Sequence, residues 1–174
     1  MNEQSRPAEP LPDGLPALLP PRFYEMDAEE AAPALLGKLL VRHDGGGSFK
    51  AGRITETEAY VGEHDLACHA RFGRTPRTAA HYGPPGHSYV YLIYGMYQML
   101  NVVVAPEDNP QAVLIRAVEP VTGIDGKTDG PGKLTRALGI DRSFNRRPFW
   151  QPPLTLHEGD EVGEFLVTPR IGID

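Results

Sequence analysis

The stretch that predicts a β-hairpin is Tyr89-Val90-Tyr91-Leu92-Ile93-Tyr94-Gly95-Met96-Tyr97, which holds four of the chain's seven tyrosines. Its side chains alternate with the period of a strand, and Gly95 supplies the backbone freedom that a hairpin tip needs. Tyr94 is therefore expected near the tip, where a side chain has little core to pack against. An exposed ring there can stack on a nucleic-acid base, which contributes about 1 to 3 kcal/mol per base. The hairpin thus indicates a nucleic-acid ligand.

The segments before the hairpin predict a helix, a strand and a long loop. Asp27 and Glu30 have the spacing of a capping box and precede a leucine stripe, so a helix is expected over residues 27–40. A glycine-rich turn over 44–48 then leads into a strand from about 49 to 60. Residues 61–87 contain four glycines and are expected to form a long ordered loop.

The segments after the hairpin predict more strands and a second helix. Short β-branched runs over 100–105 and 112–118 are typical of strands and would complete an antiparallel sheet. Pro131 suits the first position of a short helix that ends at Gly139, and its free N–H groups could hold a phosphate. A last strand is expected over 165–168.

Length and composition favour one domain. The 174 residues, 40% of them hydrophobic, suffice for one core. Residues 1–21 are rich in proline and lack periodicity, so we expect a flexible tail followed by a domain over 22–174. Because the chain stops at Asp174 soon after the last expected strand, we expect the domain to lack its C-terminal end.

The composition also limits the compartment. No apolar run approaches the roughly 18 residues that span a bilayer, and the polar N-terminus lacks a signal-peptide apolar segment, so a soluble intracellular protein is expected. The lone Cys68 excludes an internal disulfide and a multi-cysteine zinc site.

The charge distribution leaves two interpretations open. A net charge of −6 argues against a general nucleic-acid binder. Basic residues nevertheless lie on both sides of the hairpin, with Arg71, Arg74 and Arg77 before it and six from Lys127 to Arg147 after it. They would orient a duplex if the fold gathers them near the hairpin, and would otherwise be an ordinary solvated surface.

Two carboxylates on the strand over 49–60 are candidates for catalysis. Glu56 and Glu58 would lie on one face with Cα atoms roughly 6.5 Å apart, a spacing at which they could be the acid and base of a glycosidase. Alternatively, one or both face solvent. Tyr60 on the same face favours an aromatic-walled pocket that would help to set a carboxylate pKa.

Other sites have less support in the sequence. His64 and His69 bracket Asp65 and Cys68, but the spacing matches no zinc motif, so a hydrogen-bonding histidine is favoured over a metal ligand. The sequence contains neither of the glycine-rich phosphate-binding motifs and no serine in a nucleophile elbow. Nucleotide hydrolysis, NAD chemistry and serine hydrolysis are therefore not supported.

Several ordered motifs together resemble the alkyladenine (3-methyladenine) DNA glycosylase family. They are residues 56–60 (Glu-Thr-Glu-Ala-Tyr), 75–77 (Thr-Pro-Arg), the tyrosine run 89–97, Asn101, 114–120 (Leu-Ile-Arg-Ala-Val-Glu-Pro) and 130–134 (Gly-Pro-Gly-Lys-Leu). The resemblance runs from about residue 22 to the end. It implies an α+β domain with a curved antiparallel sheet or partial barrel, flanked by helices and a protruding hairpin.

The resemblance also implies a reaction. A member of this family acts in base-excision repair: it flips alkylated purines out of double-stranded DNA and excises them by water attack at the N-glycosidic bond, without a cofactor or metal. Expected substrates are 3-methyladenine and 7-methylguanine, with hypoxanthine and ethenoadenine as further candidates. The protein would be a monomer, and cytoplasmic and nucleoid-associated if bacterial.

The roles of individual residues follow from the same resemblance. Glu58 is similar to the general base and Arg116 to its partner in holding the water. The flipped base would lie among Tyr60, His69, Tyr91 and Asn101, the last obstructing the exocyclic amine of guanine. Tyr94 resembles the wedge that enters the gap in the duplex. Arg74, Arg77 and Lys133 are the candidates for contacts with the DNA backbone.

Two features bear on how far these roles transfer. His81 and Tyr82 occupy a loop position that is often more apolar in this family, so DNA contact there is in doubt. Lys50 lies at the strand end remote from Glu58, so no Schiff-base lysine is evident and a monofunctional enzyme is expected.

The alternatives to this function are a non-catalytic nucleic-acid-binding module and a carbohydrate hydrolase that uses both Glu56 and Glu58.

Overall fold

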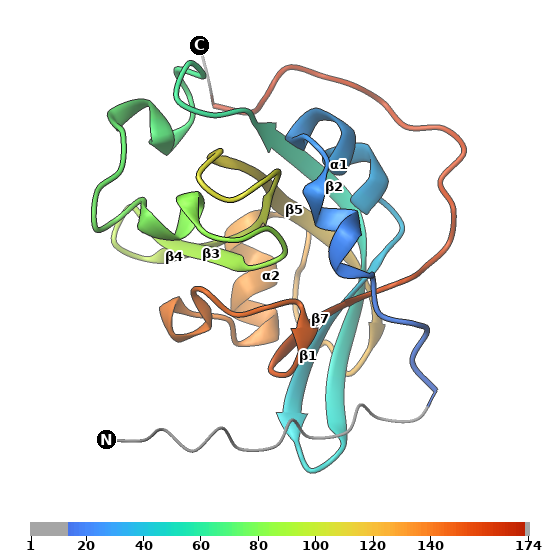
Figure 1. Ribbon diagram of the computed structural model, residues 1–174. Coiled ribbons are helices and arrows are strands. Elements are labelled where there is room, and N and C mark those ends of the chain that lie inside the picture. Colours follow the sequence, from blue (N-terminus) through green and yellow to red (C-terminus); the bar gives the residue numbers. More distant parts are fainter. Residues whose placement is uncertain (1–13, 173–174) are drawn as a thin grey trace.

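A computed structural model describes residues 14–172, and within them the strands form one seven-stranded antiparallel sheet (Figure 1). The strand order is β3-β4-β5-β2-β1-β7-β6. The strands are β1 (Leu39–Gly45), β2 (Ser48–Tyr60), β3 (Ser88–Ile93), β4 (Tyr97–Val104), β5 (Gln111–Thr122), β6 (Trp150–Gln151) and β7 (Leu154–His157). The helices are α1 (Ala28–Leu35) and α2 (Pro131–Leu138), with short 3₁₀ helices η1 (Pro21–Glu25), η2 (His69–Phe72), η3 (Ala79–Tyr82) and η4 (Arg142–Phe144).

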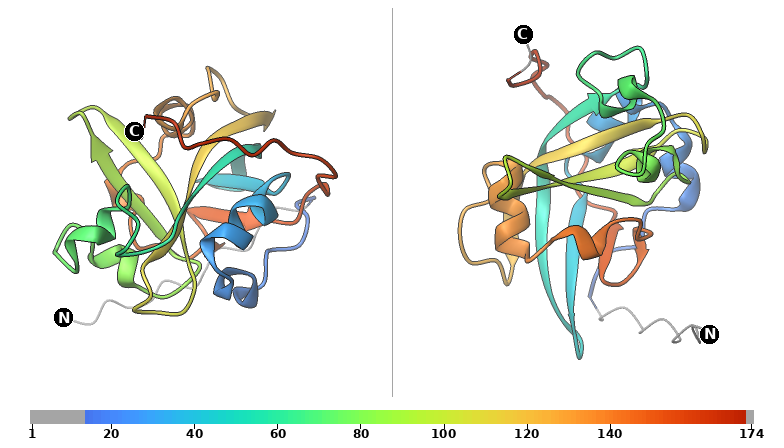
Figure 2. Two further views of the ribbon diagram at one scale, coloured as in Figure 1. Left: turned by 90° about the horizontal axis from the view of Figure 1, so that it is seen from above. Right: turned by 90° about the vertical axis from the view of Figure 1, so that its left-hand side faces the viewer.

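The sheet curls into a half-barrel, as the two views of Figure 2 show. Helix α1 packs against β2 and β5, and α2 packs against β4 and β5. Their buried side chains, among them Leu35 and Leu134, join Leu100 and Ile115 of the central strands in one core. The predicted single α+β domain with a curved antiparallel sheet is therefore confirmed.

The predicted hairpin is β3–β4, and its tip carries backbone strain. Tyr94 and Gly95 have φ values of 52° and 65°, and the amide of Met96 donates to the Ile93 carbonyl at 3.2 Å. Two successive residues with positive φ form the tight turn that suits the twist of a hairpin, a turn that favours asparagine and glycine. The tyrosine is 85% exposed, so no packing explains its presence there. Strain of this kind is typical of functional sites.

The helix expected over 27–40 is wrong in its second half. Helix α1 ends at Leu35, and Leu39 and Leu40 belong to β1. The chain leaves the helix because Gly37, at φ 81°, turns it so that the Gly37 amide donates to the Ile54 carbonyl at 2.8 Å. The helix start also differs from a capping box, because Gln111 of β5 accepts the Ala28 amide at 2.8 Å and donates to Asp27 at 3.1 Å.

The strand expected over 165–168 is also wrong. Residues 158–172, here called the C-terminal strap, contain neither strand nor helix and pass around the α1 side of the sheet to the end of β2 (Figure 1). Leu166 and Val167 are 93% and 85% exposed. An apolar β-branched run forms a strand only where a sheet edge is available to it, and the strap runs past the sheet rather than along an edge.

The expected tail over residues 1–21 is only partly described, since residues 1–13 lie outside the described part of the chain. Leu18 forms a bridge with His157, and Leu19 is fully buried with its amide donating to the Leu156 carbonyl at 2.9 Å. The packed part of the chain therefore begins before residue 22.

The strained tip predicts a stabilising substitution. Tyr94→Asn should raise the free energy of unfolding by about 1 kcal/mol, because asparagine tolerates positive φ better than tyrosine and no buried contact is lost. Urea unfolding checks this. Tyr97→Asn is the control and should destabilise, because the Tyr97 ring packs closely against Gly132 of α2. A Tyr94→Asn variant no more stable than the parent would contradict the strain.

Candidate active site

A buried carboxylate lies at the end of β2. Glu58 is 7% exposed, and its Oε2 accepts a hydrogen bond from the Tyr60 hydroxyl at 2.8 Å. Its Oε1 accepts the Ile171 amide at 3.1 Å and lies 3.3 Å from Nη1 of Arg116. A buried carboxylate is tolerable only with such donors around it. The sequence placed Glu58, Tyr60 and Arg116 in one site, and the structure brings them into contact.

The second carboxylate has a different environment. Glu56 is exposed, and its Oε2 is 3.9 Å from Nε of Arg116. The β2–β5 register shifts between Glu56 and Thr57, and Arg116 lies opposite this shift. Irregularities of this kind redirect a side chain, and here Arg116 faces both glutamates. The two carboxylates are therefore unequal: Glu58 is buried, with two hydrogen bonds and an ion pair, whereas Glu56 is at the surface.

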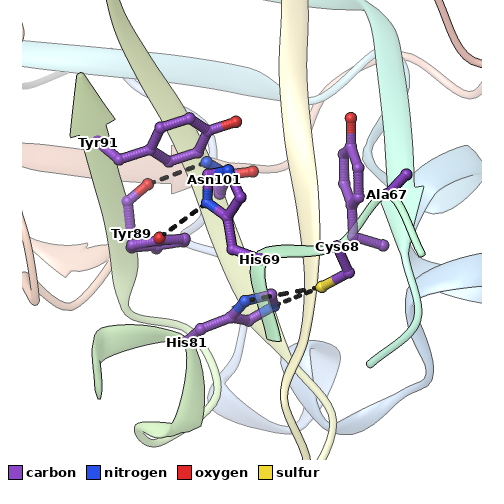
Figure 3. A pocket seen from close by; sticks show the side chains of 8 residues that line it. Ala67, Cys68, His69, His81, Tyr89, Tyr91 and Asn101 are labelled. Carbon is purple, nitrogen blue, oxygen red and sulfur yellow. Dashed lines mark hydrogen bonds between the residues drawn. The ribbon is translucent and has the colours of Figure 1, made fainter. Parts of the chain in front are cut away.

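Tyr60, which bonds to Glu58, also lines a small aromatic pocket. Figure 3 shows this pocket from close by. It is lined by Tyr60, Ala67, Cys68, His69, His81, Tyr89, Tyr91 and Asn101, and its volume is about 20 Å³. The pocket thus contains all four predicted base-pocket residues. At this volume it holds about one water molecule rather than a heterocyclic base.

The His69 ring lies against two tyrosines in the wall of the pocket. It meets the Tyr91 ring edge-on with centroids 4.5 Å apart, and its Nδ1 is 3.2 Å from the Tyr89 hydroxyl. The Asn101 amide donates to the Tyr89 carbonyl at 3.2 Å across the β3–β4 pair. His69 is therefore held by contacts with two tyrosines of β3.

The aromatic and imidazole groups around the pocket have shifted pKa values. Burial, then the hydrogen bond to Glu58, raises the pKa of Tyr60, and burial with the Glu58 charge raises that of Tyr91 to about 12. Burial and the charges of Arg77 and Arg71 lower the pKa of His69. The tyrosines are therefore donors at neutral pH, and His69 is biased toward the neutral form.

Sequence reasoning noted His81 as a departure but did not place it in the pocket, which it lines at 2% exposure. It stacks on Tyr89 with centroids 5.4 Å apart and lies 3.9 Å from the Cys68 sulfur. Burial, and then the neighbouring His69, lowers its pKa to about 4. Tyr82 is also buried and donates to Glu63 at 2.6 Å. No local spacing reveals these positions, because a 27-residue loop with two 3₁₀ turns determines them.

The predicted DNA-contacting residues are all exposed. Arg74 pairs with Asp108 and lies over the Tyr82 ring at 4.7 Å, and Arg77 lies close enough to His69 to affect its pKa. Lys133, in the first turn of α2, pairs with Asp129 at 3.1 Å. Tyr94 projects from the hairpin tip. Two of the three cations thus already have carboxylate partners.

Two kinds of feature are absent from residues 14–172. No helix there is long and apolar enough to cross a membrane. No group of three His, Cys, Asp or Glu side chains there is arranged to hold a metal ion.

Comparison with known proteins identifies a family. The model of the methylpurine-DNA glycosylase (MPG) family matches residues 22–174. A Myxococcus xanthus protein named "Putative 3-methyladenine DNA glycosylase" is 53% identical over 160 residues, covering 90% of this chain and 82% of its own. An Arabidopsis thaliana protein named "DNA-3-methyladenine glycosylase" is 44% identical over 172 residues, covering 90% of this chain and 65% of its own.

The buried imidazoles predict a pH-dependent stability. The folded pKa of His81 is below its ordinary 6.5, as is that of His157, so the unfolded chain binds more protons and stability falls as pH drops below about 6.5. For His81 alone the loss between pH 7 and pH 5 should be about 2 kcal/mol. Urea unfolding at both pH values should show a smaller loss in His81→Gln. Equal losses in parent and variant would contradict a buried neutral His81.

Proposed function

Because the chain belongs to the methylpurine-DNA glycosylase family, we propose that it excises alkylated purines from double-stranded DNA with Glu58 as the general base. The family makes it a base-excision repair glycosylase, a hydrolase of N-glycosidic bonds. The observation that supports the finer assignment is the contrast between the two carboxylates: Glu58 is buried beside an aromatic pocket, whereas Glu56 is at the surface.

The proposed reaction needs little beyond a water, a base and an anionic group. Methylation at N3 or N7 makes the purine cationic, so the electrons of the breaking glycosidic bond neutralise the departing base. Glu58 accepts a proton from the attacking water, whose oxygen bonds to the anomeric carbon, and the carboxylate faces the positive charge on the sugar. Arg116, 3.3 Å from Oε1, orients the carboxylate and the water. Suitable substrates are 3-methyladenine and 7-methylguanine, with hypoxanthine and ethenoadenine as candidates; because these last two bases are neutral, each must also take up a proton as it leaves.

The proposed base site is the pocket in an opened form. Rotation of His69 away from Tyr91 would widen the slot between Tyr91 and Tyr60 so that a purine stacks between the two rings. Base stacking of about 1 to 3 kcal/mol would offset part of the few kcal/mol that flipping requires, and flipping is easiest at a damaged base. Asn101 would obstruct the exocyclic amine of guanine.

The proposed DNA-binding face includes the hairpin tip. Tyr94 would fill the gap left by the flipped nucleotide, which accounts for a strained, exposed tyrosine at a position that favours asparagine. Arg74, Arg77 and Lys133 would contact phosphates, and Arg74 and Lys133 would exchange their aspartate partners for them. We expect a monomer, nucleoid-associated in a bacterial cell. The residues lining the pocket include no lysine, in keeping with a monofunctional enzyme.

The unequal carboxylates give the first test of this function. Single-turnover release of base is measured from a duplex carrying one 3-methyladenine or hypoxanthine. Glu58→Gln should slow release by roughly 10²- to 10⁴-fold, the usual contribution of a general base. Glu56→Gln should change the rate far less, because Glu56 is exposed and contacts only the far side of Arg116.

Each other outcome of this test has a distinct meaning. Equal losses in both variants would favour a two-carboxylate hydrolase. Tight binding of the damaged duplex without release by the parent protein would favour a non-catalytic binding module.

The second test concerns the wedge. Tyr94→Ala should weaken binding to a duplex with an abasic analogue by roughly 10- to 100-fold, the value of one stacking contact. Tyr97→Ala should weaken it less, because the Tyr97 ring packs on Gly132 of α2. Fluorescence anisotropy measures both, after urea unfolding shows that each variant is folded. Equal losses of affinity would count against Tyr94 as the wedge.

A further inference from the structure

The C-terminal strap is fixed at its two ends and exposed between them. At its start, Lys38 pairs with Glu158 at 2.9 Å and Arg53 with Asp160 at 3.0 Å. Residues 161–169 are all exposed. At its far end the strap returns to the pocket, where Arg170 is partly buried and the Ile171 amide donates to Glu58. The position of that amide is therefore set by whatever holds Arg170.

Arg170 is held by several contacts to the site. Its Nη1 and Nη2 donate to the two oxygens of Asp65 at 2.6 and 2.8 Å, and Nη1 also donates to the Ala59 carbonyl at 3.1 Å. The guanidinium lies over the Tyr60 ring, 5.0 Å from its centroid. A planar fork with two parallel bonds fixes geometry as well as charge, which lysine cannot do.

Asp65 is placed to serve as the fixed partner. Its side chain is 5% exposed and its oxygens also accept the amides of Val61 and Ala67. Burial would raise its pKa, but the bonds from Arg170 and the two amides outweigh burial and hold the pKa below its usual range. Asp65 therefore stays charged and rigid in the loop that carries His69.

We propose that Arg170 is a positioning residue for the reaction: clamped by Asp65, it holds the Ile171 amide on Glu58 and supports the outer face of Tyr60. Tyr60 bonds Oε2 and the Ile171 amide bonds Oε1, so the carboxylate is restrained at both oxygens. Loss of the clamp frees one of these restraints and leaves Arg116 as the other contact on Oε1. This inference rests on the proposed function of Glu58.

The main test compares Arg170→Met with the parent protein in single-turnover base release at saturating enzyme. Methionine keeps an unbranched chain on the Tyr60 ring but removes the fork. The rate constant should fall roughly 10- to 100-fold, as expected for a displaced catalytic group, while affinity for the abasic-analogue duplex changes less than about 3-fold. Loss of affinity with an unchanged rate constant would overturn the proposal and make Arg170 a DNA contact.

Matched variants separate positioning from general loosening of the strap. Arg53→Met also removes an ion pair to the strap, but at its opposite end, and should leave the rate constant within about 3-fold of the parent value. Arg170→Lys should restore only part of the rate, because it keeps the charge but not the fork. Asp65→Asn should slow release as Arg170→Met does, and the double variant should be no slower than either. Equal losses in Arg53→Met and Arg170→Met, or full activity in Arg170→Lys, would contradict the clamp.

Hydrogen exchange distinguishes failure of this inference from failure of the proposed function. The Ile171 amide should exchange roughly 10-fold faster in Arg170→Met than in the parent or in Arg53→Met, whether or not base is released. If the parent releases no base, the proposed function fails while this readout still tests the clamp. Unchanged exchange at Ile171 in Arg170→Met would show that Arg170 does not hold the strap on Glu58.

Discussion

A carboxylate buried in a protein requires hydrogen-bond donors, and the architecture of this protein is organised around meeting that requirement at Glu58. Its oxygens accept hydrogen bonds from Tyr60 and the Ile171 amide and pair with Arg116, so the strand that carries Glu58, a neighbouring strand and the C-terminal strap must all be in place together. The long β2–β5 pairing positions Tyr60 and Arg116. The Ile171 amide lies on the C-terminal strap, which has no sheet partner and is held at the site by the ion pair of Arg170 with Asp65.

The aromatic pocket beside Glu58 depends on the same arrangement. Tyr60 contributes both a donor to the carboxylate and a wall of the pocket, so the two parts of the site share a side chain. The pocket has a volume of only about 20 Å³, and His69 rests against Tyr91 in its wall. Tyr94 at the hairpin tip differs from these buried rings. Its positive φ lowers the stability of the fold, and its ring is exposed rather than packed.

Much of this site followed from local patterns. Alternation predicted β3, a glycine-rich turn predicted β2, β-branched runs predicted β4 and β5, and Pro131 with Gly139 predicted both ends of α2, because these signals arise within a few residues. The helix predicted over 27–40 was wrong in its second half because a leucine pair suits a helix or a strand equally. The hydrogen bond from the Gly37 amide to the Ile54 carbonyl directs this part of the chain into a strand. The strand over 165–168 failed because strand formation needs a partner, which no local pattern supplies.

The sequence by itself determined the hairpin with its exposed Tyr94, the pairing of Glu58 with Tyr60 on one face, and the family resemblance carried by the motifs. Each of these depends on residues close together along the chain. Only the tertiary structure decided that Glu58 is buried and Glu56 exposed, that His81 lines the pocket, and that Arg170 reaches Asp65 across 105 positions. Burial and long-range ion pairs depend on how segments distant in the sequence pack together, and local sequence patterns do not specify that packing.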